Sequence, residues 1–525
     1  MRGIHLVALA PLAGALAVAL VAGGTPIEPA AVSQPGSRGF EEIDEDGVSA
    51  TLAVLCSPYL EGRDSPSRGL AFACDYVAKR FEEAGLESPE GVDGYLATYT
   101  RNLPAPDLEE SRLESPLERE VAAGVDFVPL LGCPGSARGP AVFCGYGIGV
   151  KEFDELDDLE LAGAIAVLVE GEPRHKRVLR GEEVSEAANV FRKLQLLRDA
   201  GAVGALVVRR PVDEDESAPR GWPAREELPF RHTWAMWVGA NVPVMGPSPI
   251  PALQVSWAFA EELLGDDLDA RMKSIDRSGK PKPWEGPRPE VSIASVTVQR
   301  DVPIANVVGI VRGSDPKLRD EYVVIGAHLD HIGVDPLGRI GRGADDNASG
   351  SAAMLEAVEA LAAEPPARSV LAISFTSEED GLLGSKAIAR DLPVPRESVV
   401  AMVNLDMIGR GERDGCVALG IRENPLMEDI VDEARRRFRT GIKSVETRKG
   451  QELFARSDHY SFHEIGIPAV FFFEHVPLSD NPDYHTWRDL EEYVDTRKIA
   501  NTSRLAYGVT RLLADREERL PRPGR

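Results

Sequence analysis

The chain has 525 residues, of which 43% are hydrophobic and 27% are charged. At about 150 residues per domain, this length predicts roughly three folded units, and it excludes a small scaffold that depends on disulfides for its stability. The 59 basic and 85 acidic residues give a formal net charge of −26. Because like charges repel, this balance disfavours nucleic acids and anionic membranes as partners.

The first 24 residues have the pattern of a secretory signal peptide. Arg2 supplies positive charge, and the apolar run at 6–22 ends in small residues. The run is long enough that an uncleaved membrane anchor remains an alternative. Pro11 favours cleavage, after which residues 25–42 form a linker. We therefore expect an exported protein, periplasmic or extracellular, without stable insertion in a membrane.

The five cysteines leave two possibilities open in an exported chain. Cys56 could pair with Cys74, and Cys133 with Cys144, which would leave Cys416 single. Alternatively, all five are buried thiols, and the sequence does not separate these cases.

The pattern of apolar residues along the chain changes near residue 126. Residues 43–125 include an amphipathic helix at 69–86, and we assign them to the N-terminal part of a main domain. From 126 to 290, short strand-like runs alternate with glycine and proline, which predicts a smaller, β-rich α/β domain inserted into the main one. Its expected strands lie at 141–145, 164–169 and 205–208, and its expected helix at 189–200.

The main domain resumes at 291–515 and is followed by a charged tail at 516–525. It alternates helices with short, continuous apolar strands, which suit a sheet that is buried on both faces. The expected strands are 322–327, 369–376, 399–405 and 468–473, and a helix is expected at 351–363. The sequence thus predicts an α/β fold with a mostly parallel mixed sheet and helices on both faces.

Histidine and acidic side chains follow the ends of these strands. Because the carboxyl ends of parallel strands meet at one edge of a sheet, we expect these side chains to lie close together. Two imidazoles and several carboxylates suit zinc, or less specifically cobalt and manganese. Their number allows two metals that share a bridging carboxylate. The candidate residues are His328, Asp330, Asp345, Glu378, Glu379, Asp406 and His485.

Five motifs carry a resemblance to a known family. They are HLDH at 328–331, GADDNASG at 343–350, SEED at 377–380, NLDMIG at 404–409 and YHT at 484–486. In this order they resemble the zinc aminopeptidases of the bacterial leucyl aminopeptidase and aminopeptidase Y type. The resemblance covers residues 304–513 and extends weakly to Leu60–Arg63, while residues 126–290 look like the protease-associated domain of such enzymes.

The resemblance implies a role for each candidate residue. His328 and Asp406 would hold one zinc, and Glu379 and His485 a second. Asp345 would bridge the two ions, and the Asp345–Asp346 peptide would be cis, a costly geometry. Glu378 would be the general base. Asp330 would orient His328.

Several of these assignments have an alternative in the residues themselves. The Asp345–Asp346 pair could instead cap the following helix. His475 competes with His485, which we favour because Thr486 and Asp489 resemble the start of a helix.

Further residues near the last strand are harder to assign. Asp458 and His459 are expected to line the substrate pocket, with capping of a helix at 459–465 as the equal alternative. His331 and His463 are expected to be structural or to support the metal ligands.

The leading functional prediction is a secreted metal-dependent exopeptidase, most readily an aminopeptidase that acts on peptides with a free N-terminus. A carboxypeptidase on the same scaffold would need an arginine to hold the substrate carboxylate, and Arg410 or Arg456 could supply it. Acyl transfer at a single zinc, as in glutaminyl cyclases, fits the full two-metal set less well. A non-catalytic binding protein should have lost part of that set, and no residue of it is missing.

Overall fold

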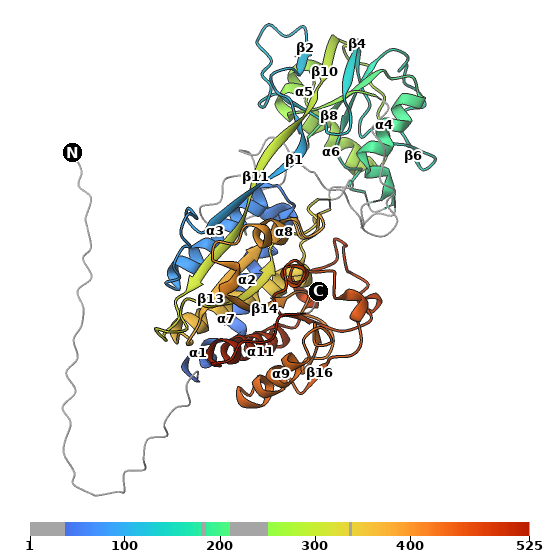
Figure 1. Ribbon diagram of the computed structural model, residues 1–525. Coiled ribbons are helices and arrows are strands. Elements are labelled where there is room, and N and C mark those ends of the chain that lie inside the picture. Colours follow the sequence, from blue (N-terminus) through green and yellow to red (C-terminus); the bar gives the residue numbers. More distant parts are fainter. Residues whose placement is uncertain (1–36, 176, 180–184, 210–249, 335–338, 524–525) are drawn as a thin grey trace, which may run out of the picture. The chain divides into compact units, whose positions relative to one another are not determined.

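The larger of the two main sheets has eight strands in the order β1-β11-β13-β12-β14-β17-β15-β16 (Figure 1). The computed structural model describes residues 37–175, 177–179, 185–209, 250–334 and 339–523, so the predicted signal peptide lies outside the described residues. The strands are β1 (Leu96–Pro106), β11 (Thr297–Val311), β12 (Tyr322–His328), β13 (Ser369–Phe375), β14 (Val399–Leu405), β15 (Gly415–Leu419), β16 (Ser444–Glu446) and β17 (Ala469–Phe473).

The centre of this sheet is parallel and its edges are mixed. Strand β12 pairs in parallel with β13 and β14, and β14 pairs in parallel with β17. Strands β1, β11 and β13 are joined by antiparallel pairing, as are β15 and β17. The four strands expected from the apolar runs are present within one residue of their expected ends, and the predicted fold class is confirmed.

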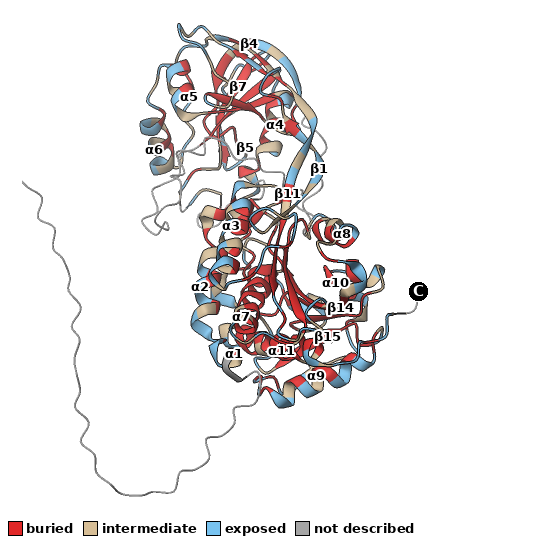
Figure 2. Cartoon of the chain, turned by 60° about the vertical axis from the view of Figure 1, so that its left-hand side comes forward, coloured by how far each residue is buried: buried red, intermediate tan, exposed pale blue. Residues whose placement is uncertain are grey.

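Helices cover both faces of the larger sheet, as predicted. Figure 2 shows α2, α3 and α7 on one side of the buried strands and α8 and α10 on the other. Neighbouring strand residues therefore enter different cores: Val323 and Ile325 join one hydrophobic cluster, and Val324 joins the other. The helices are α1 (Ser37–Glu42), α2 (Glu45–Leu55), α3 (Arg68–Glu83), α7 (Gly350–Ala363), α8 (Leu383–Arg390), α9 (Leu426–Arg437), α10 (His459–Glu464) and α11 (Thr496–Asp515).

A second sheet of seven strands has the order β2-β10-β4-β7-β8-β9-β3 and its own hydrophobic cluster. Its strands are β2 (Arg112–Glu114), β3 (Phe127–Pro129), β4 (Gly135–Phe143), β7 (Ile165–Val169), β8 (Gly204–Val208), β9 (Ala252–Val255) and β10 (Glu290–Ser295). Its helices are α4 (Val190–Asp199), α5 (Trp257–Leu264) and α6 (Leu268–Ser278), and β5 (Gly149–Val150) pairs with β6 (Phe153–Asp154).

The second sheet extends beyond the predicted limits of 126 and 290. Strand β2 pairs with β10, and β10 ends at Ser295. Strand β2 has three residues and only Leu113 is buried, so it has too little alternation to be recognised in the sequence.

All five cysteines are buried free thiols in the structure, so the second of the two possibilities holds. Burial raises the pKa of Cys74 and of Cys416 to about 12, which keeps these thiols protonated and unreactive. None of the described helices is long and apolar enough to span a membrane.

Because the two main sheets have separate hydrophobic clusters, a core substitution in one sheet should leave the stability of the other unchanged. Leu206 lies fully buried in β8, and its replacement by alanine should cost the second-sheet core about 2–5 kcal/mol, because a cavity remains. Hydrogen exchange should accelerate for the β8 amides and stay unchanged for the β12 amides. Equal acceleration in both strands would contradict the separation of the two cores.

Candidate metal centre

The ends of the parallel strands meet as expected. Within the described residues, two groups of three side chains have ligand atoms that lie within 4.8 Å of one another. The first group is His328, Glu378 and Asp406, and the second is His331, Asp346 and Glu379. His328 ends β12, the two glutamates follow β13, and Asp406 follows β14.

The carboxylate of Asp346 faces two imidazoles at once. Its Oδ1 lies 3.3 Å from Nε2 of His328, and its Oδ2 lies 3.1 Å from Nε2 of His485. His328 Nε2 also lies 3.2 Å from Asp406 Oδ1, and His485 Nε2 lies 2.8 Å from Glu379 Oε2. The site therefore consists of two imidazole–carboxylate pairs joined by one carboxylate.

The prediction that Asp345 bridges the site is wrong. Its Oδ1 accepts a hydrogen bond from the Gly409 amide at 2.7 Å, and its Oδ2 accepts one from Asn481 at 3.2 Å. Asp345 thus faces away from both histidines, and the cis peptide is Asp346–Asn347, one residue later than predicted. The motif contains two adjacent aspartates, and the sequence alone does not show which one the loop turns toward the strand ends.

The capping alternative for this aspartate pair is also not realised. Helix α7 begins without a side-chain hydrogen bond at its N-cap, Ser349. The Gly350 amide instead donates to Asn347 Oδ1 at 2.9 Å, and the Met407 amide donates to the same oxygen at 3.2 Å. Asn347 therefore ties this loop to the segment that follows β14.

No helix starts at Thr486, so the helix predicted from Thr486 and Asp489 is wrong. The Thr486 hydroxyl donates to the Asp483 carbonyl. The buried carboxylate of Asp489 accepts hydrogen bonds of 3.0 Å from the amides of Asp345 and Asp346. A capping spacing and a carboxylate that binds a distant loop look the same in a sequence, and here Asp489 holds the loop that carries Asp346.

Two histidines compete for the position beside Glu379. His485 occupies it, with Nε2 2.8 Å from Glu379 Oε2, whereas His475 lies 3.4 Å from Glu474. His331, expected to be structural, is fully buried, with its Nδ1 2.9 Å from Glu379 Oε1. It contacts Oε1 of Glu379, whereas His485 contacts Oε2.

Asp330 positions the two glutamates. Its carboxylate accepts hydrogen bonds from the amides of Glu378 at 3.1 Å and Glu379 at 3.3 Å. The Asp330 backbone carbonyl lies 3.2 Å from His328 Nδ1, and a carboxylate oxygen of Asp330 lies 3.9 Å from the same atom. Donation from Nδ1 to this carbonyl leaves Nε2 as the free ligand atom.

The Leu60–Arg63 segment is part of the site's support. Arg63 is fully buried and donates to the carbonyls of Leu329 at 2.7 Å, Arg342 at 2.7 Å and Gly343 at 3.0 Å, and also to that of Leu55. The guanidinium thus joins the segment after β12 to the start of the Asp346 loop. Only the family resemblance drew attention to this arginine, because its role depends on carbonyl groups that are distant in sequence.

Close pairing of imidazoles and carboxylates shifts the pKa values of the site residues. Burial alone would lower the pKa of His485, but Glu379 and Asp346 raise it to about 11. Burial alone would raise the pKa of Glu379, as does the nearby Asp346, but His485 and His331 lower it to about 2. Burial and the neighbouring carboxylates raise the pKa of Glu378 well above its usual range, against the effect of His328.

The donor set fits metal ions. The carboxylates of Asp346, Glu379 and Asp406 face the two imidazoles, and Asp330 and Asp458 are buried close by. Acidic groups therefore outnumber cationic groups in a region shielded from water, which is costly unless cations neutralise them. Nitrogen and carboxylate oxygen donors are those that zinc prefers.

The two expected substrate-pocket residues lie close to the site but differ in their surroundings. Asp458 is fully buried, and neither of its oxygens has a hydrogen-bond partner among the described residues. His459 stacks on Phe471 with ring centroids 4.8 Å apart and meets the edge of Phe454. Burial lowers the pKa of His459 to about 3, so this ring is neutral. Asp458 precedes α10 without a side-chain capping bond, so capping is not its role.

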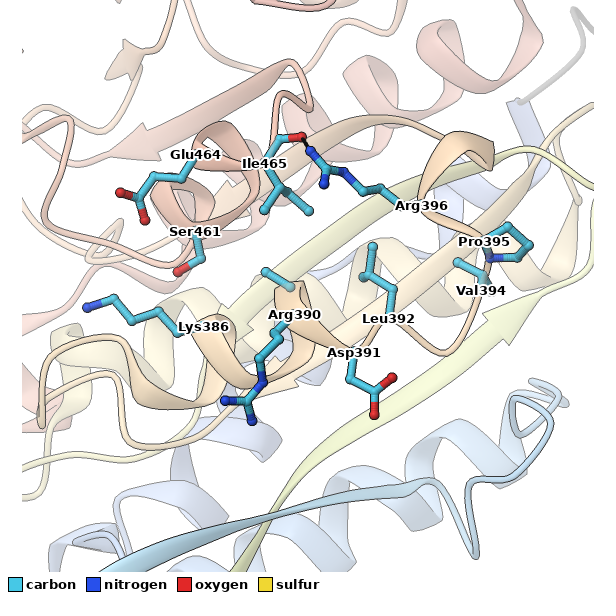
Figure 3. Close-up of a pocket in the computed structure, with 11 residues that line it drawn as sticks. Lys386, Arg390, Asp391, Leu392, Val394, Pro395, Arg396, Ser461, Glu464 and Ile465 are labelled. Atoms are coloured by element: carbon cyan, nitrogen blue, oxygen red, sulfur yellow. Dashed lines mark hydrogen bonds between the residues drawn. The ribbon is translucent and has the colours of Figure 1, made fainter. Parts of the chain in front are cut away.

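A surface cavity of about 610 Å³ lies between α8 and α10 (Figure 3). Lys386, Arg390 and Arg396 contribute positive charge to its lining, and Figure 3 shows these side chains pointing in different directions. None of the candidate metal ligands lines it.

Residues 306–510 match the model of peptidase family M28. This part of the chain is therefore similar to peptidase family M28. Probable leucine aminopeptidases of Trichophyton verrucosum and Arthroderma benhamiae are each 34% identical over 213 residues, which are 39% of this chain and 57% of each relative. The chain therefore spans little more than half the length of these relatives.

Solved structures of two bacterial aminopeptidases are similar to most of the chain. An aminopeptidase from Aneurinibacillus sp. strain AM-1 is similar over 93% of this chain and 97% of its own, at 19% identity and a TM-score of 0.45. BSAP, a zinc aminopeptidase from Bacillus subtilis, is similar over 90% of this chain and 96% of its own, at 18% identity and a TM-score of 0.46.

The corrected position of the bridge can be tested with two isosteric substitutions. Asp346→Asn should weaken zinc binding by more than the roughly 10–100-fold typical of residues outside the ligand set. Asp345→Asn should weaken it by less than about 10-fold, because burial and Glu474 raise the pKa of Asp345 and the amide mimics a protonated carboxyl. Competition with a chromogenic chelator measures both affinities, and the reverse order would restore Asp345 as the bridge.

Proposed function

We propose that the protein is a zinc-dependent aminopeptidase that holds two metal ions. The observation that carries this proposal is the Asp346 carboxylate, whose two oxygens face different histidines. His328 and Asp406 would hold one ion, Glu379 and His485 the other, and Asp346 both. The match of residues 306–510 to peptidase family M28 supports the same reaction class.

The ions would supply a nucleophilic water and polarise the carbonyl of the scissile bond. Glu378 lies in the same group as His328 and Asp406, so its carboxylate is placed to take a proton from that water and later release it. In this proposal Glu378 removes the proton of the attacking water and delivers it to the leaving amine. Asp330 keeps Glu378 in place through its backbone amide.

The substrate's α-ammonium group needs an acidic partner. Asp458 is buried near Glu378 and has no hydrogen-bond partner within the described parts of the chain, so we assign it to this group. His459 would contribute an apolar wall through its neutral ring, because it packs between Phe454 and Phe471.

The arginines considered for a carboxypeptidase are already engaged. Arg410 donates to Asp483 at 2.9 Å and lies 3.5 Å from Asp489. Arg456 donates to the Tyr484 hydroxyl at 3.2 Å. Arg410 is thus paired with carboxylates rather than free for a substrate carboxylate, which favours recognition of the amino end, whereas the partner of Arg456 is a neutral hydroxyl.

We also propose that the protein is exported and that it carries an inserted domain. The apolar run at 6–22 supports export, and the second sheet with its separate core supports an inserted protease-associated domain. This domain would act as a covering or partner-binding element, while the metal ligands all come from the larger sheet and its loops.

The role of Glu378 predicts a separation of metal binding from turnover. Glu378→Gln should keep its zinc and lose about 10²–10⁴-fold in kcat on leucine p-nitroanilide, because the amide cannot accept the proton. Zinc content and steady-state rates are measured on the same preparation. Unchanged turnover would refute the assignment of the base.

The choice between exopeptidases is tested with one peptide in two forms. The free peptide should release its N-terminal amino acid, and its N-acetylated copy should resist cleavage, since the α-ammonium group is lost. Mass spectrometry of the products measures both. Release of the C-terminal residue from the acetylated peptide would establish the carboxypeptidase instead.

A further inference from the structure

A buried hydroxyl lies directly before the two glutamates of the metal centre. Ser377 is fully buried, and its φ of 55° places it in the left-handed region. For a residue other than glycine this conformation costs about 1–2 kcal/mol, so the surroundings must hold it. The turn at Ser377 separates the end of β13 from Glu378 and Glu379, and it therefore sets the direction in which both side chains leave the strand.

Three polar groups converge on the Ser377 hydroxyl. The Tyr99 hydroxyl lies 2.8 Å away, Ser65 Oγ lies 2.5 Å away, and Arg101 Nη1 donates to it at 3.2 Å. The Tyr99 hydroxyl also lies 3.0 Å from the hydroxyl of Thr376, the preceding residue.

Arg101 extends the same network past the glutamates. Its Nη1 donates to the Ser65 carbonyl at 3.0 Å and forms an ion pair with Asp380, the residue after Glu379. The side chain of Arg101 is only 12% exposed, so solvent screens this pair less than it would a pair on the surface. The glutamate pair is thus held on both flanks, at Ser377 and at Asp380.

Tyr99 and Arg101 belong to the same face of β1, because side chains alternate along a strand. Strand β1 pairs with β11 from Leu96↔Val307 to Pro106↔Thr297, and the chain then continues into β2 of the second sheet (Figure 1). The strand that leads into the second sheet therefore also contacts the turn that carries the catalytic glutamates.

We propose that Tyr99 and Arg101 are positioning residues for Glu378 and Glu379, and that they act through the Ser377 hydroxyl and the Asp380 carboxylate. This inference rests on the proposed function, since it concerns the same glutamates. Asp330 binds their amides from the side of β12, and the β1 residues bind the turn from the side of the edge strands.

The test compares two tyrosines that each lose one hydroxyl. Tyr99→Phe should lower kcat on leucine p-nitroanilide by about 10–100-fold, the range typical of groups that orient a metal ligand, with little change in KM. Tyr95→Phe is the matched control, because the Tyr95 hydroxyl donates to the Leu86 carbonyl at 2.7 Å, away from the turn. Both variants should lose similar thermal stability, so a difference in kcat would not reflect unfolding.

A conservative rescue separates positioning from packing. All three polar contacts of Arg101 use Nη1, so one ammonium group can replace part of them. Arg101→Lys should retain more activity than Arg101→Met, although both lose the guanidinium. Equal activity of these two variants, or equal kcat for Tyr99→Phe and Tyr95→Phe, would overturn the inference.

Titration of the metal-free proteins with Co²⁺ distinguishes this failure from failure of the proposed function. The visible absorption of bound Co²⁺ reports its coordination, and Tyr99→Phe should bind Co²⁺ more weakly than Tyr95→Phe because Glu379 is less well placed. If the wild-type protein binds Co²⁺ without cleaving peptides, the proposed activity fails, and this comparison still decides the role of Tyr99. If the wild-type protein binds no Co²⁺, both proposals fall.

Discussion

Both oxygens of the Asp346 carboxylate face an imidazole, and the organisation of the site depends on this contact. A carboxylate can join two cations only if its loop directs one of its oxygens toward each of them. Three parallel strands bring histidine and acidic side chains to either side, and Asp346 comes from the loop that opens the helix behind them. In the proposed function, bound cations would offset the excess of buried negative charge and so add to the stability of the folded protein.

The loops of the centre are held by polar contacts to the backbone rather than by apolar packing. Asp489 binds the amides of Asp345 and Asp346, Asp330 binds those of the two glutamates, and Arg63 binds carbonyls from two further segments. Buried networks of this kind specify one geometry when every member is satisfied. They also explain why segments distant in sequence, such as the one containing Arg63, are needed for the site.

The strands and helices that have a clear apolar pattern could be predicted from the sequence. The strands ending at His328 and Leu405 and the helix at 350–363 lie where their patterns indicate, because both faces of the sheet are buried. The choice between Asp345 and Asp346 was not predictable, since a dihedral change in the loop exchanges their directions. Asp489 was misassigned as part of a capping motif, because its partners lie in a loop far away in the sequence. Strand β2 was missed because it is short and only Leu113 is buried.

The most direct test of the account is a crystal structure of the zinc-loaded protein with data collected on both sides of the zinc absorption edge. Two anomalous peaks are predicted, one between His328 and Asp406 and one between Glu379 and His485, with Asp346 in contact with both ions. A single peak that does not contact Asp346, or a pair of ions bridged by Asp345, would contradict the account.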